Sequence, residues 1–186
     1  PIPAMCVFTR FRALPRQDGS HSLCRQFQKG NPMSFNIRRV VTGHDASGKT
    51  KILIDGNADK PTSRRPGHAS QLIWTTDQSP ADNIGDADAG AVEIGRPPGP
   101  NGTIFRIMEI QPGGTPEMHN TDTIDYVTVI TGQITMEMDD DEYVVMEAGD
   151  VMVQRGTNHS WHNRGDVPCR LSVVLIDAKS LDGVRA

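Results

Sequence analysis

The chain has 186 residues, of which 36% are hydrophobic and 5% aromatic, and its formal net charge is −4. This length predicts one domain with a buried core. The charge forms no basic stripe, which argues against nucleic acid as a partner, and no apolar run approaches the ~20 residues that span a membrane. The cysteines (Cys6, Cys24 and Cys169) form no close pair, which is typical of reduced thiols in a cytoplasmic protein.

Residues 1–32 differ from the rest of the chain. They lack a periodic apolar pattern and carry several arginines, with Asp18 as their only acid. We predict a leader or arm outside the fold, which either precedes a natural start at Met33 or was translated from an upstream start codon. An arginine-rich transit peptide is the alternative, although the helical amphipathicity of this segment is poor.

From Met33 onward the pattern predicts one strand after another. Residues 33–100 are expected to supply N-terminal strands and loops, with strands at 35–41, 51–54 and 70–76. Residues 101–178 are expected to form the core, with strands at 103–110, 125–131, 133–138, 142–146, 151–154 and 170–176, and residues 179–186 form a tail. Glycine, proline and aspartate clusters separate these runs, and no helical period exceeds about three turns. The sequence therefore predicts an all-β fold, a barrel or a sandwich, with few or no long helices.

Two histidines and a carboxylate are expected to converge in this fold. Because alternate residues of a strand share a face, Glu117, His119 and Thr121 point one way. Asp125 is expected on the inward face of the next strand, and His159 follows a turn at residues 156–158. Two imidazoles and one carboxylate around a common point form a 2-His-1-carboxylate metal site, which leaves open positions for water, oxygen or substrate.

The order of these residues resembles the two motifs of the cupin superfamily. The first motif runs from glycine through two histidines and a glutamate to a second glycine. Gly113 or Gly114, His119, Asp125 and Gly132 follow that order. The second motif runs from a Gly-Asp pair through a turn to histidine and asparagine, as do Gly149, Asp150, Gly156, His159 and Asn163, with the turn one residue short. The resemblance covers roughly residues 100–178 and implies a small antiparallel jelly-roll β-barrel, often a homodimer through its N-terminal strands. The apolar edge strand around residues 37–41 also needs cover.

The chain departs from the family pattern at two ligand positions. Thr121 stands where the family has its second histidine, and Asp125 stands where it has glutamate. The resemblance therefore implies a reduced ligand set of His119, Asp125 and His159, with Glu117 as an alternative ligand, for Fe, Mn, Ni or Zn. Catalytic metal sites often keep three protein ligands. The alternative is a site that has lost its metal.

Further residues are expected around this site. Thr121, Met136, Met138 and Trp161 are expected to line the pocket. Arg106 is expected to face solvent, because its neighbours Phe105 and Ile107 are the more apolar pair. His44 and His68 lie in polar turns, where histidines are more often bystanders than ligands.

Three functions follow from these residues. The first is a metal-dependent enzyme acting on a small molecule as an oxygenase, decarboxylase, isomerase or lyase, with His119, Asp125 and His159 as catalytic residues. The second is a metal-free enzyme in which a histidine is the general base and Asp125 its partner or acid. The third is a module that binds a small ligand without turnover. The fold alone does not choose among them.

Overall fold

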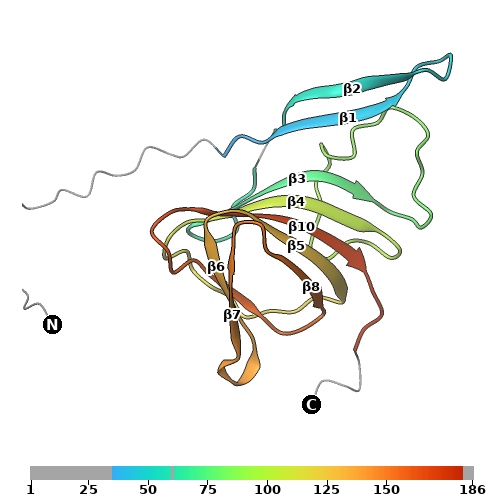
Figure 1. Ribbon diagram of the computed structural model, residues 1–186. Coiled ribbons are helices and arrows are strands. Elements are labelled where there is room, and N and C mark those ends of the chain that lie inside the picture. Colours follow the sequence, from blue (N-terminus) through green and yellow to red (C-terminus); the bar gives the residue numbers. More distant parts are fainter. Residues whose placement is uncertain (1–34, 60, 182–186) are drawn as a thin grey trace, which may run out of the picture. The chain divides into compact units, whose positions relative to one another are not determined.

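The structure, a computed structural model, describes residues 35–59 and 61–181. The predicted leader, residues 1–32, and the last part of the predicted tail lie outside the described residues. The first two strands, β1 (Arg38–His44) and β2 (Thr50–Asn57), form an antiparallel hairpin with a register shift after Val41 (Figure 1). The predicted N-terminal strands are therefore present, but the first begins three residues later than expected.

A five-stranded sheet makes up most of the remaining fold. Its spatial order is β3–β4–β10–β5–β8, and every neighbouring pair is antiparallel (Figure 1). The strands are β3 (His68–Thr76), β4 (Thr103–Ile110), β5 (Thr123–Thr131), β8 (Val151–Arg155) and β10 (Cys169–Asp177). Because β10 lies between β4 and β5, it pairs with two strands that are distant from it in the sequence.

A three-stranded sheet has the order β7–β6–β9. It consists of β6 (Gln133–Glu137), β7 (Tyr143–Glu147) and β9 (Ser160–His162), and a 3₁₀ turn, η1 (Asp139–Asp141), joins β6 to β7. Asp140 and Asp141 adopt φ values of 56° and 59°, a left-handed conformation that aspartate tolerates better than most residues. Within the described part of the chain η1 is the only helical element, so the predicted all-β class is confirmed.

Strict alternation of side chains positions the core. Along β10 the residues Cys169, Leu171, Val173 and Leu175 are buried, while the residues between them are only partly so. On β5 the same alternation buries Asp125 beside Val127 and leaves Tyr126 52% exposed. Asp125, a polar residue of the cavity, thus lies on the face of β5 that also carries core residues.

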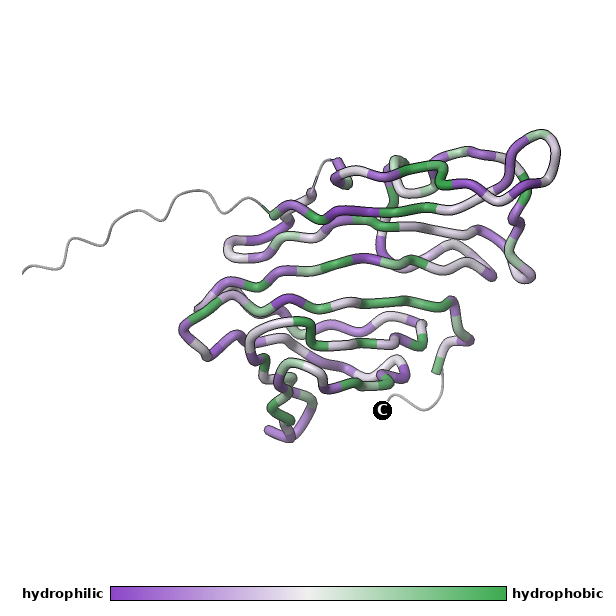
Figure 2. Tube along the Cα trace, turned by 45° about the horizontal axis from the view of Figure 1, so that its top comes forward, coloured by the Kyte–Doolittle hydropathy of each residue, from purple (hydrophilic) through white to green (hydrophobic). Residues whose placement is uncertain are grey.

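Hydrophobic and hydrophilic residues are interspersed along the strands rather than collected in one long apolar run (Figure 2). Within residues 35–59 and 61–181 no helix is long and apolar enough to cross a membrane.

Gly132 joins β5 to β6 in a position that only glycine fits. Its φ is 77°, and a Cβ atom there would lie 2.7 Å from the carbonyl oxygen of Pro168. Both the left-handed backbone and the close approach require the absence of a side chain. Gly132 thus forms a tight turn between the two sheets, and not a hairpin, because β5 and β6 do not pair with each other.

Candidate active site

A cavity of about 480 Å³ lies against the inward faces of β3, β4, β5 and β10. Segments 62–65 and 88–96 and the ends of β8 and β9 complete its wall. This volume suits a small organic molecule. His119, Thr121, Asp125, His159 and Trp161 all line it, so the cavity collects side chains from the two motif regions.

A reciprocal pair of backbone hydrogen bonds holds the two histidines together. His119 N donates to the His159 carbonyl oxygen and His159 N donates to the His119 carbonyl oxygen, each at 2.9 Å. The two rings lie 4.4 Å apart between centroids, tilted by 49°. The main chain, rather than the side chains, therefore sets the spacing of this pair.

The hydrogen bonds of His119 determine its tautomer. His119 Nδ1 lies 2.9 Å from the Glu117 carbonyl oxygen, which can only accept, so Nδ1 carries the proton. In the described residues Nε2 has no hydrogen-bond partner, and the half-buried ring borders the cavity. His119 thus presents an available lone pair to a bound molecule.

His159 is more deeply buried and has partners at both ring nitrogens. Nδ1 donates to the Thr157 carbonyl oxygen at 3.0 Å, and the Gln154 amide nitrogen lies 3.2 Å from Nε2 and also contacts Nδ1. Burial lowers the pKa of His159 to about 4, and the nearby positive charges of His119, Arg65 and Arg96 act in the same direction. The edge-on ring of Trp161, 5.7 Å away between centroids, packs against it. At neutral pH His159 is therefore a neutral, fixed imidazole.

Asp125 is a buried carboxylate with one unsatisfied oxygen. The residue is 6% exposed, and its Oδ1 atom has no hydrogen-bond partner. Burial raises its pKa, while a hydrogen bond from Thr123 and the charges of Arg106 and His119 oppose the rise. Thr123 also shares a 2.7 Å hydrogen bond with Thr121, the residue at the missing histidine position. Asp125 is thus held closer to its neutral form than an exposed carboxylate would be.

Comparison with known proteins identifies the family of this chain. The model of the cupin domain matches residues 106–176. The cupin-domain-containing oxidoreductase virC of Hypocrea virens is 32% identical over 149 residues, which is 77% of each chain. The chain belongs to the cupin family. Phomopsin biosynthesis cluster protein C′ of Diaporthe leptostromiformis is 33% identical to this cupin, over 86% of this chain and 88% of its own. The solved cupin domain of Cnp3 from Schizosaccharomyces pombe aligns with 80% of this chain and 92% of its own, at 12% identity and a TM-score of 0.47.

As positioned, the donors of this cupin do not fit a metal ion. The free Nε2 of His119 and the unpaired Oδ1 of Asp125 are suitable donors in kind. However, both nitrogens of His159 are engaged by Thr157 and Gln154. Among the described residues no three His, Cys, Asp or Glu side chains form a group that could hold a metal ion. The carboxylate of Glu117, the predicted alternative ligand, lies instead 3.0 Å from Arg65.

Two of the predicted pocket residues contribute to the core. Met136 is 4% exposed within the hydrophobic cluster, and Met138 packs against it; neither lines the cavity. Met136 lies on β6 and Met138 directly follows it. The sequence pattern does not define how this three-stranded sheet packs. Thr121 and Trp161 line the cavity as expected.

The prediction that Arg106 faces solvent is wrong. Arg106 lines the cavity, and its Nε and Nη2 atoms are buried without hydrogen-bond partners. Both faces of β4 are covered: Ile104 and Ile110 share the face of Arg106, while Ile107 is buried on the opposite face. With apolar residues in both phases, alternation alone could not assign the inward face.

Other residues of the cavity were not found from the sequence. His68 opens β3, is 8% exposed and borders the cavity, although its sequence context is a polar turn. Its pKa is lowered by burial and then by the charge of Arg65. Arg64 and Arg96 come from loops whose course over the cavity no periodic pattern predicts. The arginines in these loops are the sequence feature that could have indicated a cationic side of the cavity.

Proposed function

We propose that this cupin is an enzyme that moves protons on a small organic substrate bound in the cavity. The observation that carries this proposal is that a free imidazole lone pair, at His119, and a buried carboxyl group whose pKa is raised, at Asp125, lie in one cavity wall. A base and an acid of this kind, in reach of one ligand, are the components of general acid–base catalysis. Isomerisation, dehydration and lyase reactions all begin with such a proton transfer.

Each residue has a distinct role in this proposal. His119 Nε2 accepts a proton from the substrate, and the carbonyl oxygen of Glu117 stabilises the imidazolium through Nδ1–H. Asp125 donates a proton to the atom on which negative charge develops. His159 is a positioning residue, which supports the His119 ring through the backbone bridge and the ring contact. Trp161 and the aliphatic wall exclude water from the reacting atoms.

Exchange of substrate hydrogen with heavy water tests this function. A panel of small oxo acids and oxo esters is incubated with the protein in D2O, and deuterium at carbon is followed by NMR. We expect incorporation or product formation that survives chelation, is lost in His119→Ala, and falls less in His159→Gln. Lys51→Ala, on the exposed β1–β2 hairpin, is the matched control. Ligand-induced thermal stabilisation without any exchange or turnover would identify a binding module instead.

A metal-dependent enzyme is the second candidate function. Two observations favour it: the unpaired Oδ1 of Asp125 and the free Nε2 of His119 both belong to the cavity. In addition, the relative from Hypocrea virens is named an oxidoreductase, and a redox reaction requires a group that accepts electrons. His119, Asp125 and His159 would hold a divalent ion, provided that Gln154 releases His159. Bound to them, the ion would act as a Lewis acid or a redox centre.

Metal content separates the two candidates. Near-equimolar Fe, Mn, Ni or Zn in the purified protein, lost in His119→Ala, together with activity that disappears on chelation, would support the metal-dependent enzyme. Turnover by chelated protein without metal would support acid–base catalysis.

A further inference from the structure

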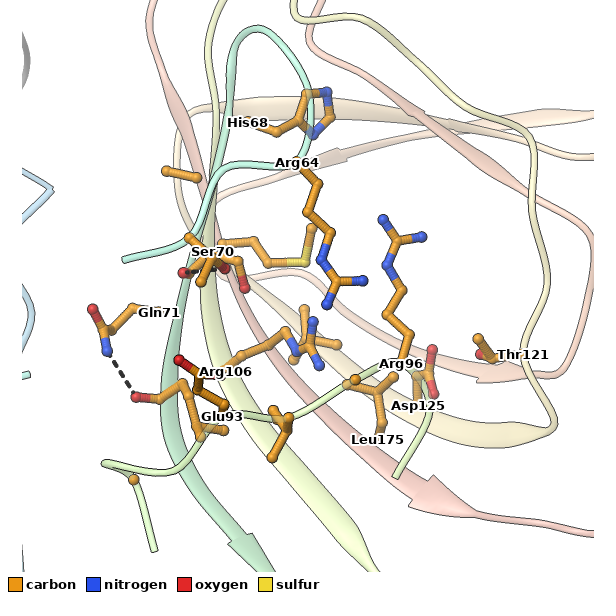
Figure 3. Close-up of a pocket in the computed structure, with 18 of the residues that line it drawn as sticks. Arg64, His68, Ser70, Gln71, Glu93, Arg96, Arg106, Thr121, Asp125 and Leu175 are labelled. Atoms are coloured by element: carbon orange, nitrogen blue, oxygen red, sulfur yellow. Dashed lines mark hydrogen bonds between the residues drawn. The ribbon is translucent and has the colours of Figure 1, made fainter. Parts of the chain in front are cut away.

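Among the described residues five arginines line the cavity, and three of them direct their guanidinium groups into the same space (Figure 3). Arg64 comes from the segment before β3, Arg96 from the loop before β4, and Arg106 from β4 itself. Figure 3 shows all three side chains directed into the same space, with Asp125 and Thr121 nearby. We call Arg64, Arg96 and Arg106 the arginine cluster. Like charges that face the same space repel each other, so the cluster is electrostatically unfavourable without a bound anion.

Arg106 experiences this repulsion most directly. Burial, followed by the charges of Arg64 and Arg96, lowers the pKa of Arg106 to about 10, while the charge of Asp125 acts in the opposite direction. Two of its guanidinium nitrogens, Nε and Nη2, are buried without a hydrogen-bond partner. Buried charges in native proteins are ordinarily paired, so this guanidinium lacks the acceptor that would satisfy it.

The acidic residues of the region neutralise only part of the arginine cluster. Glu117 forms ion pairs with Arg65 at 3.0 Å and with Arg96 at 3.8 Å. Asp88 is bound to Arg39, which lies outside the cluster. Within residues 35–59 and 61–181, Arg64 and Arg106 form no ion pair or hydrogen bond. The other acidic residues of the cavity wall, Asp59, Glu93 and Asp125, form no ion pair with the cluster within the described part of the chain, so Arg64 and Arg106 keep unpaired positive charges.

Part of the cavity wall is apolar. Met108, Val127 and Leu175 line the cavity beside the cluster, and the His119–Asp125 wall adjoins it. A fitting ligand thus combines anionic groups, for the guanidiniums, with a hydrocarbon body. Arginine forks bind carboxylates through two parallel hydrogen bonds, which defines both charge and orientation.

We propose that the substrate class of this cavity is a small organic dianion, a dicarboxylate, whose carboxylates are bound by Arg64, Arg96 and Arg106 while its carbon skeleton lies against His119 and Asp125. This inference rests on the proposed enzymatic function and specifies its substrate. The two carboxylates of the dianion match Arg64 and Arg106, the two guanidiniums of the cluster that form no ion pair within the described residues. The bound dianion supplies the acceptors that Arg106 lacks and relieves the repulsion within the cluster.

Calorimetric titration with matched ligands tests this proposal. Succinate is the dianion, butyrate the monoanion and dimethyl succinate the neutral analogue, all at constant ionic strength. We expect succinate to bind about tenfold or more tightly than butyrate, the diester not to bind, and added salt to weaken the binding of succinate. In Arg106→Gln the affinity for succinate should fall by about tenfold or more. Arg38→Gln, whose exposed arginine pairs with Asp55 on the hairpin, should leave it unchanged.

Several outcomes would overturn the inference. Equal affinity for succinate and its diester, or an unchanged affinity in Arg106→Gln, would show that the cluster does not select anions. Tighter binding of inorganic phosphate than of succinate would assign the cavity to phosphate esters. Thermal melting of Arg106→Gln is the control. A melting temperature at least as high as that of the parent protein shows that a loss of binding does not come from unfolding.

The two proposals can fail separately. If dicarboxylates bind but no oxo acid in the panel exchanges hydrogen or reacts in a manner that depends on His119, the substrate class stands and the enzymatic function fails. If only neutral oxo esters react, the enzymatic function stands and the dicarboxylate inference fails.

Discussion

Arg106 shows how one side chain can serve binding at the expense of stability. Its guanidinium is buried beside two other arginines, and two of its nitrogens have no partner. Replacing an unpaired buried charge by an apolar group of similar volume often stabilises a protein. The same group is the strongest indication that the cavity is made for an anion.

Arg106→Met should therefore unfold at a higher temperature than the parent protein. We expect a gain on the order of 1–2 kcal/mol, or roughly 2–8 °C in a domain of this size, because the guanidinium no longer has to be desolvated. Differential scanning calorimetry in phosphate-free and carboxylate-free buffer measures it. A decrease in melting temperature would mean that Arg106 is satisfied in the folded protein, and Arg38→Met provides the comparison for an exposed arginine.

His159 should make stability depend on pH. Its pKa is about 4 in the folded protein against an ordinary value of 6.5, so unfolding takes up a proton between these values. The stability it contributes is complete above pH ~6.5 and is lost as the pH falls towards 4, by up to about 3 kcal/mol. The raised pKa of Asp125 acts in the opposite sense, being favourable at low pH and lost as pH rises.

The effect of His159 is isolated by comparing the parent protein with His159→Gln. Urea unfolding at pH 7 and at pH 4.5 should show a larger loss of stability in the parent than in the variant. Parallel losses in both proteins would contradict the neutral state assigned to this imidazole.

The sequence predicted the motif residues of the site but not the cation cluster. His119, Asp125 and His159 occur at recognisable spacings, and the cavity includes all three. Arg106 was assigned to the wrong face, because β4 is apolar in both phases and because the residues that bury it come from distant strands. Arg64 and Arg96 lie in loops, where position depends on tertiary contacts rather than on periodicity.

At the level of elements, strands with alternating burial were predicted best. The range of β4 agrees with the structure, and β5 and β10 differ from prediction by two residues or fewer. The strand β9 was missed, since three residues are too few to display a period. Its place is fixed by pairing with β6 and by the residue that follows it, Asn163.

Asn163 connects β9 to the end of β4. Its side-chain nitrogen donates to the carbonyl oxygens of Ile110 at 2.7 Å and Val167 at 2.8 Å, and its Oδ1 accepts from Gly165 N at 3.0 Å. Asn163→Ala should lower the free energy of unfolding by about 2–4 kcal/mol, because it leaves buried backbone groups without partners. Urea denaturation measures this loss. Asn158→Ala, which removes one exposed bond to Asp139, is the control and should cost well under 1 kcal/mol.

For the whole molecule, we predict a homodimer formed through the β1–β2 hairpin. Val40 is 48% exposed and Ile52 is 60% exposed on this two-stranded sheet, and exposed apolar strands need cover. Light scattering after size exclusion should give twice the chain mass. The variant Val40→Lys with Ile52→Lys should give a monomer.

A matched substitution tests where the dimer forms. Val153→Lys changes an equally exposed valine, 61% accessible, on the edge strand β8. It should leave the dimer intact. A monomer from Val153→Lys and a dimer from the hairpin variant would place the interface on β8 instead.

The backbone bridge between residues 119 and 159 has a consequence for how this site can change over time. Because main-chain amides hold the two positions together, the frame does not depend on which side chains stand there. Substitutions at these positions alter the chemistry while the geometry persists. Such a site can exchange ligands, acids and bases one residue at a time, and an engineer could introduce new reactive groups into it without redesigning the scaffold.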